Sequence, residues 1–248
     1  MGRLEIMGIS KSFGANRVLE EVSFSVEEGE FVSILGPSGS GKSTLFHIIG
    51  GILLPDQGEI FLDGKNIVGK RGSISYTPQS PSLLPWRTVL ENVLLGQELV
   101  GMREEERAKQ MLEKAGLHGF ENAYPHELSG GMKQRVSFIR SLLSPQPLIC
   151  LDEPFSALDE FTRIQMQKWL QNLWMENRRS VLFITHNIEE ALFLSDKIII
   201  MSKKPSKVER QIPIPFLRPR KEDIILTEEF LAWKREIYNE IAGQTGSP

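Results

Sequence analysis

The stretch Glu30–Thr44, "EFVSILGPSGSGKST", decides the fold of this 248-residue chain. Its apolar run predicts a buried strand, and residues 36–43 match the pattern G-x-x-x-x-G-K-[ST] in full. A loop of this kind between a strand and a helix aims backbone N–H groups and the positive end of the helix at phosphate oxygens. The sequence therefore predicts a site for ATP, with Lys42 at the β- and γ-phosphates and the Ser43 hydroxyl as a ligand of Mg²⁺.

The whole loop is expected to surround the phosphates, because each of its backbone groups lies within one tight turn. Thr44 supplies a second hydroxyl nearer the α- and β-phosphates. The expected nucleotide contacts of the loop are Gly36, Pro37, Ser38, Gly39, Ser40, Gly41, Lys42, Ser43 and Thr44.

A second apolar run, "LICLDEP" at 148–154, ends in two carboxylates. Asp152, at the end of this predicted strand, is placed to hold Mg²⁺ or its bound water. Glu153 is placed to polarise an attacking water, as a general base would. The alternative is structural, since Asp followed by Glu is also a common start of a helix.

Two more polar side chains follow predicted strands. Gln79, in "SISYTPQ", can reach Mg²⁺ and the water while it joins the core to the next block. His186, in "VLFITHN", can contact the γ-phosphate and hold Glu153 in line, or it can be an ordinary helix cap. The candidate catalytic residues are thus Lys42, Gln79, Glu153 and His186, and the candidate metal ligands are Ser43, Gln79 and Asp152.

The rest of the chain alternates strands and helices. A strand, a connecting helix and a second strand in succession imply that the two strands pair in parallel through a right-handed crossover. The sequence therefore predicts an α/β fold. We expect an ATPase domain at 1–205 with a helical block inserted at about 80–143. A proline-broken, basic extension follows at 206–248, and it ends in an amphipathic helix opened by Thr227. We expect this extension to be a packing appendage.

The helical block contains a second glycine pair, in "LSGGMKQR" at 128–135. A glycine pair at a helix start is another phosphate-binding arrangement, yet residues 36–43 already hold the phosphates of one nucleotide. The block places it on a separate part of the molecule. Two copies related by a twofold axis would let each "LSGG" cover the γ-phosphate bound by the other copy.

Composition narrows the partners. The formal net charge is -3, which argues against a nucleic-acid partner, because nucleic-acid binding needs a basic face. The single cysteine, Cys150, excludes a disulfide framework and is expected to be a buried apolar residue. The longest apolar runs are strand-length, well short of the roughly 20 residues that cross a bilayer.

These motifs in this order, with "SALD" after "LDEP", resemble the ATP-binding subunits of ABC transporters over about residues 3–205. The resemblance implies a P-loop NTPase core with a mainly parallel sheet, an antiparallel β subdomain, an inserted helical subdomain and a dimer that sandwiches the nucleotide. It also implies that Phe13, otherwise a core aromatic, stacks on adenine. By the same resemblance Asp159 crosses the dimer seam, and the residues that contact the partner's γ-phosphate are Ser129, Gly130 and Gly131.

Finer features, such as "THNIEEALFLSDKIIIMS" and "RPR" at 218–220, are similar to the nitrate, sulfonate and taurine importer group. Met132, Thr77-Pro78 and Ser80 depart from that pattern. The likeness implies an integral membrane permease as partner, a substrate-binding protein as an indirect partner, and a peripheral place on the cytoplasmic face of the cell membrane.

The permease would insert a helix into a groove at 80–95, beside the apolar Trp86, which could instead be core. Two other functions fit parts of the sequence. A soluble ABC ATPase, such as an iron–sulfur assembly scaffold, fits the length. A P-loop kinase would need an acceptor pocket and a lid, and would leave "LSGG" unexplained.

Overall fold

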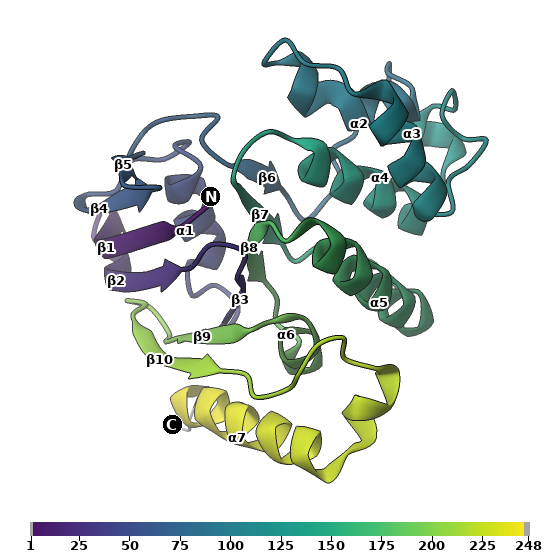
Figure 1. Ribbon diagram of the computed structural model, residues 1–248. Coiled ribbons are helices and arrows are strands. Elements are labelled where there is room, and N and C mark those ends of the chain that lie inside the picture. The colour runs from purple at the N-terminus through teal and green to yellow at the C-terminus, as the bar shows by residue number, and fades with distance from the viewer. Residues whose placement is uncertain (1, 246–248) are drawn as a thin grey trace.

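The computed structural model describes residues 2–245, which fold around a central sheet and a smaller antiparallel sheet (Figure 1). The central sheet has the strand order β10-β9-β3-β8-β7-β6. Its strands from β9 to β6 pair in parallel, and β10 runs antiparallel to β9 at the edge. The bounds are β3 Phe31–Leu35, β6 Ser75–Thr77, β7 Leu148–Asp152, β8 Ser180–Ile184, β9 Lys197–Met201 and β10 Val208–Pro213.

Every residue of β3, β7 and β8 is buried, because apolar side chains pack on both faces of the sheet. On one face Phe31, Phe183 and Trp174 belong to the core that includes the helical block. On the other face Val32 and Cys150 pack toward the antiparallel sheet. The expected burial of Cys150 is confirmed, since none of its surface is accessible.

Parallel pairing brings the carboxyl ends of β3, β6, β7 and β8 to one edge of the sheet. The residues that follow these four strands are therefore neighbours in space although they are far apart in sequence. This edge collects the start of the glycine-rich loop and the segments that carry Gln79, Glu153 and His186. Ligands of open α/β sheets bind outside this edge.

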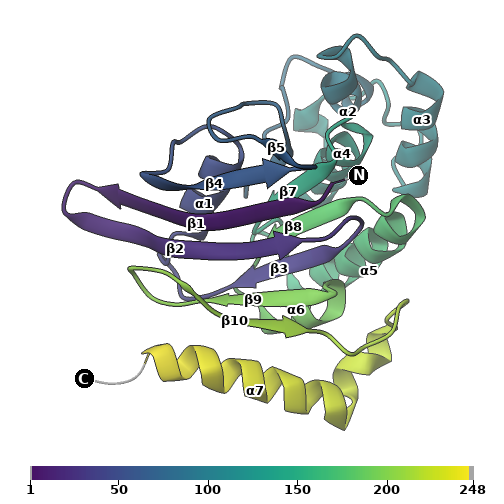
Figure 2. The same ribbon diagram turned by 60° about the vertical axis from the view of Figure 1, so that its left-hand side comes forward.

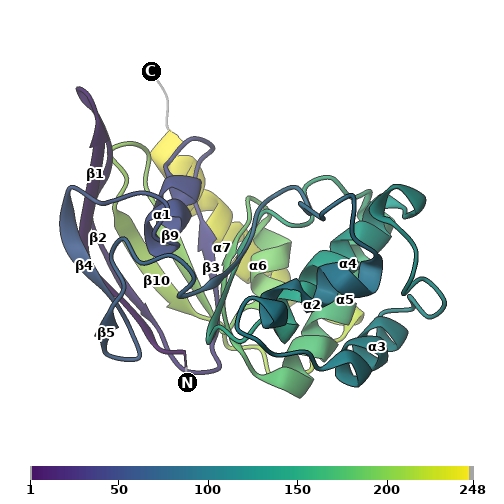
Figure 3. The same cartoon turned by 90° about the horizontal axis from the view of Figure 1, so that it is seen from above.

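The smaller sheet has the order β2-β1-β4-β5, and all its pairings are antiparallel. It packs its apolar face on helix α1, Lys42–Ile49, which begins inside the glycine-rich loop. Figure 3 shows this sheet on one side of the central strands and helices α2, α3 and α4 on the other. The bounds are β1 Leu4–Phe13, β2 Asn16–Val26, β4 Gln57–Leu62 and β5 Lys65–Asn66.

The helical block follows β6 and returns to β7. It contains α2 Val89–Glu98, α3 Glu105–Lys114, the short 3₁₀ turn η1 Pro125–Glu127 and α4 Gly130–Leu143. Helix α5, Glu160–Asn177, links β7 to β8, and α6, Ile188–Leu194, links β8 to β9. No helix of residues 2–245 is both long and apolar enough to cross a membrane.

The C-terminal segment continues the central sheet through β10 and then crosses to η2, Glu222–Leu226, and α7, Glu228–Thr245. Helix α7 packs Phe230 and Ile237 against α6 and β9, and Figure 2 shows it lying along β10. Thr227 precedes this helix, and its Oγ1 accepts a hydrogen bond from the backbone N–H of Phe230 at 3.3 Å. The mainly parallel sheet, the antiparallel sheet and the helices confirm the expected α/β fold class.

Candidate active site

In the glycine-rich loop, backbone conformation and close packing within the chain require glycine at several positions. Gly39 and Gly41 have φ values of 75° and 102°, a left-handed conformation that other residues rarely adopt. A Cβ atom on Gly41 would also lie 2.7 Å from Cγ1 of Val18 in β2, and one on Gly36 would lie 2.7 Å from the carbonyl oxygen of Met201 in β9. The loop is therefore closely packed between the two sheets.

Lys42 lies inside this loop, with only 6% of its surface exposed. Its Nζ donates to the carbonyl oxygens of Gly36 and Pro37, at 2.9 Å each. Burial lowers the pKa of Lys42, and the nearby carboxylates of Glu153 and Asp152 oppose that shift. A buried cation held among backbone carbonyls is well suited to exchange those partners for phosphate oxygens.

Asp152 ends β7 and is almost fully buried, which raises the pKa of its carboxyl; hydrogen bonds from Ser43 and Tyr76 oppose the shift. The Tyr76 hydroxyl donates to Oδ2 at 3.2 Å. Sequence analysis missed Tyr76, whose only signal was its place near the end of a predicted strand. It reaches Asp152 because β6 lies beside β7, with Tyr76 paired to Cys150.

Ser43 and Asp152 suit Mg²⁺ in their chemistry, since both offer oxygen ligands and they hydrogen-bond to one another. Within residues 2–245 no cluster of three or more His, Cys, Asp or Glu side chains could hold a metal by itself. A magnesium ion here would take its other ligands from phosphates and water, as it does in nucleotide sites.

Glu153 has an unusual backbone, with φ at 43°, and its N–H donates to the carbonyl oxygen of Ile184 at 2.9 Å. Left-handed conformations at such residues are found at functional sites. Its Oε2 lies 3.2 Å from Nδ1 of His186, so the structure brings these two predicted residues together. Asp152 does not cap a helix, because α5 begins only at Glu160; the structural alternative for the carboxylate pair is wrong.

His186 follows the end of β8, and its side chain is 60% exposed. It is not a helix cap, because Asn187 caps α6 by accepting from the N–H groups of Glu189 and Glu190. Gln79, the third candidate metal ligand beside Ser43 and Asp152, is engaged in a hydrogen bond of its own. Its Nε2 donates to Ser156 Oγ at 3.1 Å, and that hydroxyl donates to the carbonyl oxygen of Glu153 at 2.9 Å.

The "LSGG" segment forms a second, separate pocket at the start of α4. The Ser129 hydroxyl caps this helix by accepting from the N–H of Met132 at 3.3 Å. A Cβ on Gly130 would meet no atom within 4 Å, and one on Gly131 would lie 3.3 Å from Thr162 Cγ2. The lining residues of this pocket include Ser129, Gly130, Gly131, Asp159 and Thr162.

The pocket at the glycine-rich loop shares no residue with the "LSGG" pocket. Its lining consists of Ser38, Gly39, Gly41, Lys42, Ser43, Thr44, Glu153 and Lys204. Sequence analysis missed Lys204, which comes from the turn between β9 and β10. One chain therefore carries two glycine-rich helix starts that open into different pockets.

Two residues singled out by resemblance are at the surface. Phe13 ends β1 with 50% of its surface exposed, so it is not a core residue, and the Nζ of Lys11 lies 5.7 Å from its ring centre. Asp159 caps α5 by accepting from the N–H of Thr162 at 3.0 Å. That hydrogen bond lowers the pKa of Asp159.

A glycine-rich loop after a buried strand, with a carboxylate pair at the end of a neighbouring strand, defines a nucleotide-hydrolysing enzyme of the P-loop class. Within that class the chain belongs to the ABC transporter family, whose model matches residues 19–156. It is an ATPase and an ATP-binding protein of this family.

Several known proteins are similar over most of the chain. An aliphatic sulfonates import ATP-binding protein SsuB from Zymomonas mobilis is 40% identical over 236 residues, which cover 95% of each chain. A taurine import ATP-binding protein TauB from Escherichia coli is 43% identical over 218 residues, 87% of this chain and 86% of that protein. A dimeric ATP-binding cassette in a post-hydrolysis state, bound to ADP and Pi, has a TM-score of 0.72 at 32% identity, with 86% of this chain and 100% of that chain covered.

Proposed function

We propose that this chain is the ATP-hydrolysing subunit of an importer for small anionic or zwitterionic solutes of the sulfonate, taurine or nitrate type. It would act as a twofold dimer bound to a separate membrane permease, on the cytoplasmic face of the membrane. The similarity to sulfonate and taurine import proteins supports the transport class. The observation that carries the dimer is the separation of the "LSGG" pocket from the glycine-rich loop.

In this proposal the loop at 36–44 holds the phosphates, with Lys42 at the β- and γ-phosphates. Mg²⁺, held by Ser43, Asp152 and Gln79, would neutralise charge on the phosphate oxygens. Glu153 accepts a proton from the attacking water. His186 orients the Glu153 carboxylate through the contact between its Nδ1 and Oε2 of Glu153. Phe13, half of whose surface is exposed, would stack on adenine.

The "LSGG" residues complete the centre on the other copy. Ser129, Gly130 and Gly131 offer a hydroxyl, bare backbone and the positive end of α4 to a partner's γ-phosphate. Asp159 lines the same pocket, which in this proposal lies at the dimer seam. ATP then joins the two copies, and its hydrolysis releases them.

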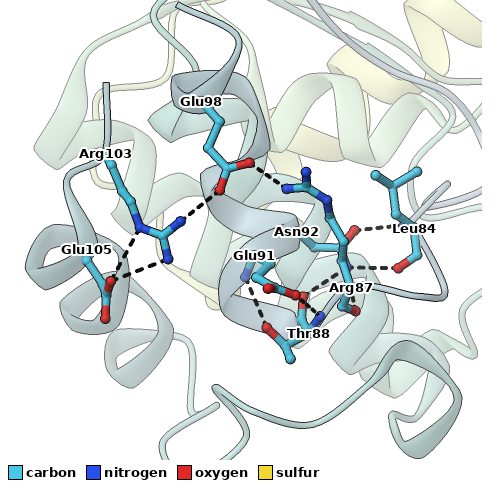
Figure 4. Close-up of polar contacts among 8 residues, drawn as sticks. All are labelled: Leu84, Arg87, Thr88, Glu91, Asn92, Glu98, Arg103 and Glu105. Atoms are coloured by element: carbon cyan, nitrogen blue, oxygen red, sulfur yellow. Dashed lines mark hydrogen bonds and ion pairs between the residues drawn. The ribbon is translucent and has the colours of Figure 1, made fainter. Parts of the chain in front are cut away.

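The permease is proposed to dock beside Trp86, whose surface is 70% exposed. Hydrogen bonds from the side chain of Asn92, which is fully buried, fix the backbone of the turn that carries Trp86 (Figure 4). Its Oδ1 accepts from the N–H of Leu84 at 2.7 Å, and the two hydrogens of its Nδ2 are shared among the carbonyl oxygens of Leu84, Arg87 and Thr88. Because a turn fixed in this way keeps its shape, it can pass movement between Gln79 and a docked helix.

The test is uptake of labelled taurine, an alkanesulfonate and nitrate by cells that lack this chain. The wild-type chain should restore uptake of one of these solutes, and Glu153→Gln should restore none. A polytopic membrane protein should co-purify with both. Restoration of no uptake, together with a soluble protein as the only stable partner, would contradict the importer and favour an assembly scaffold.

A further inference from the structure

The pocket at the glycine-rich loop contains one cation that no motif predicts. All but two of its lining residues belong to the segment Ser38–Thr44, and the exceptions are Glu153 and Lys204. Lys204 lies in the turn between β9 and β10, about 160 residues after the end of the loop at Thr44. Tertiary structure alone therefore brings it to this pocket.

The turn that carries Lys204 is fixed to the small sheet. Ser206 is fully buried; its N–H donates to the carbonyl oxygen of Val18 at 2.9 Å, and its own carbonyl accepts from the N–H of Glu20 at 2.9 Å. The turn is closed by Ser202, whose Oγ accepts from the N–H of Lys207 at 2.9 Å. In Figure 2 this turn lies at the same end of the strands as the turn between β1 and β2.

The same contacts fix the turn relative to the phosphate loop. Val18, which receives the hydrogen bond from Ser206, is also the residue that Gly41 packs against. Met201, at the end of β9, packs its carbonyl against Gly36. Val18 and Met201 thus lie between the turn and the two ends of the loop, which holds the backbone of Lys204 beside the pocket.

The Lys204 ammonium is not engaged elsewhere in the part of the chain that the structure describes. Within residues 2–245 the side chain forms no ion pair and no hydrogen bond. The neighbouring Lys207, by contrast, pairs with Glu20 at 2.8 Å. A long, unpaired cation at the rim of a phosphate site is placed to bind an anionic ligand there, because opposite charges attract more strongly where protein displaces water.

We propose that Lys204 is a phosphate-binding residue of the nucleotide site, and that its ammonium contacts the phosphate chain of bound ADP or ATP. The inference rests on the nucleotide site of the proposed function. It adds a contact from outside the glycine-rich loop, so the turn between β9 and β10 becomes part of the binding surface.

The experiment measures the Kd of ADP with Mg²⁺ by titration calorimetry on the full chain. Lys204→Gln should weaken binding about threefold to fivefold, the usual scale for one exposed ion pair. Lys203→Gln, which removes the same charge from the same turn but does not line the pocket, is the matched control and should stay close to wild type. Lys204→Arg should restore most of the affinity.

Salt separates an ionic contact from a change of shape. The difference between wild type and Lys204→Gln should shrink between about 50 mM and 500 mM KCl, because salt screens exposed charges. Equal affinities for Lys204→Gln and Lys203→Gln would overturn the inference and leave the nucleotide site intact. Failure of the wild-type chain to bind ADP would overturn the nucleotide site itself.

Discussion

The two glycine-rich segments of this chain differ in what explains their glycines. In the phosphate loop, Gly41 has a left-handed backbone and touches Val18, so the chain itself requires a glycine there. In the "LSGG" segment, Gly130 begins an ordinary helix and faces open space. Internal packing explains the glycine at position 41, and it does not explain the one at position 130. The proposed contact with a second copy of the chain would account for this difference.

The largest expected effect comes from Glu153→Gln. The amide keeps the size of the side chain but cannot accept a proton, so ATP turnover should fall about 10²- to 10⁴-fold while ATP binding survives. The variant should accumulate as a dimer with ATP in light scattering, because bound ATP is no longer consumed. Glu229→Gln, on the exposed face of α7, should behave as wild type. A monomeric Glu153→Gln with ATP bound would remove the need for an external partner.

The matched pair Gly41→Ala and Gly130→Ala tests the comparison directly. Gly41→Ala should lower the free energy of unfolding by about 2–4 kcal/mol, through backbone strain and overlap with Val18. Gly130→Ala should keep or raise stability by up to about 1 kcal/mol, since alanine favours a helix. Its turnover should nevertheless fall about 10- to 100-fold, because the methyl group would displace the γ-phosphate of the proposed partner copy.

Urea unfolding and steady-state ATPase assays measure the two quantities. Full turnover in Gly130→Ala would contradict an external role for that glycine, whatever its stability.

Sequence patterns located the residues that follow buried strands, because a strand, its end and the next polar residue are local features. Glu153 and His186 were found in this way, and parallel pairing of β7 with β8 brings them together. Tyr76 and Lys204 were not found, because they reach the site through long-range pairing that leaves no local pattern. Gln79 was identified, yet its hydrogen bond to Ser156 depends on a rotamer that sequence cannot specify.

A smaller effect is expected from the two aspartates, which should respond to pH in opposite ways. Burial raises the pKa of Asp152, so its charge destabilises the fold above that pKa, and the penalty disappears as pH falls through it. Asp152→Asn should therefore stabilise the nucleotide-free protein at pH 8, and by less at lower pH.

Asp159 has a lowered pKa because it accepts a hydrogen bond as a helix cap. Its contribution is present above the ordinary pKa of an aspartate and is lost as pH falls through the lowered value. Asp159→Ala should thus destabilise the protein at pH 8, and the loss should fade in acid. Thermal unfolding at several pH values measures both variants. Stabilisation by both substitutions at pH 8, or destabilisation by both, would contradict the opposite pKa shifts assigned to the two aspartates.

The smallest effect on the isolated protein is expected from Trp86→Ala. Because Trp86 is mostly exposed, stability should change by no more than about 0.5 kcal/mol, and basal ATPase activity should stay the same. Uptake in cells should fall, since the docking surface is lost. Asn92→Ala should reduce both stability and uptake, because it removes the hydrogen bonds that hold the turn. Normal uptake with Trp86→Ala would place the docking surface elsewhere.

The most direct test of a catalytic centre shared between two copies is specific ATPase activity as a function of protein concentration. Light scattering on the same samples, with ATP present, gives the fraction of dimer. Specific activity should follow that fraction and approach zero as the protein is diluted into monomers. A monomer that hydrolyses ATP at the full rate would contradict the shared centre.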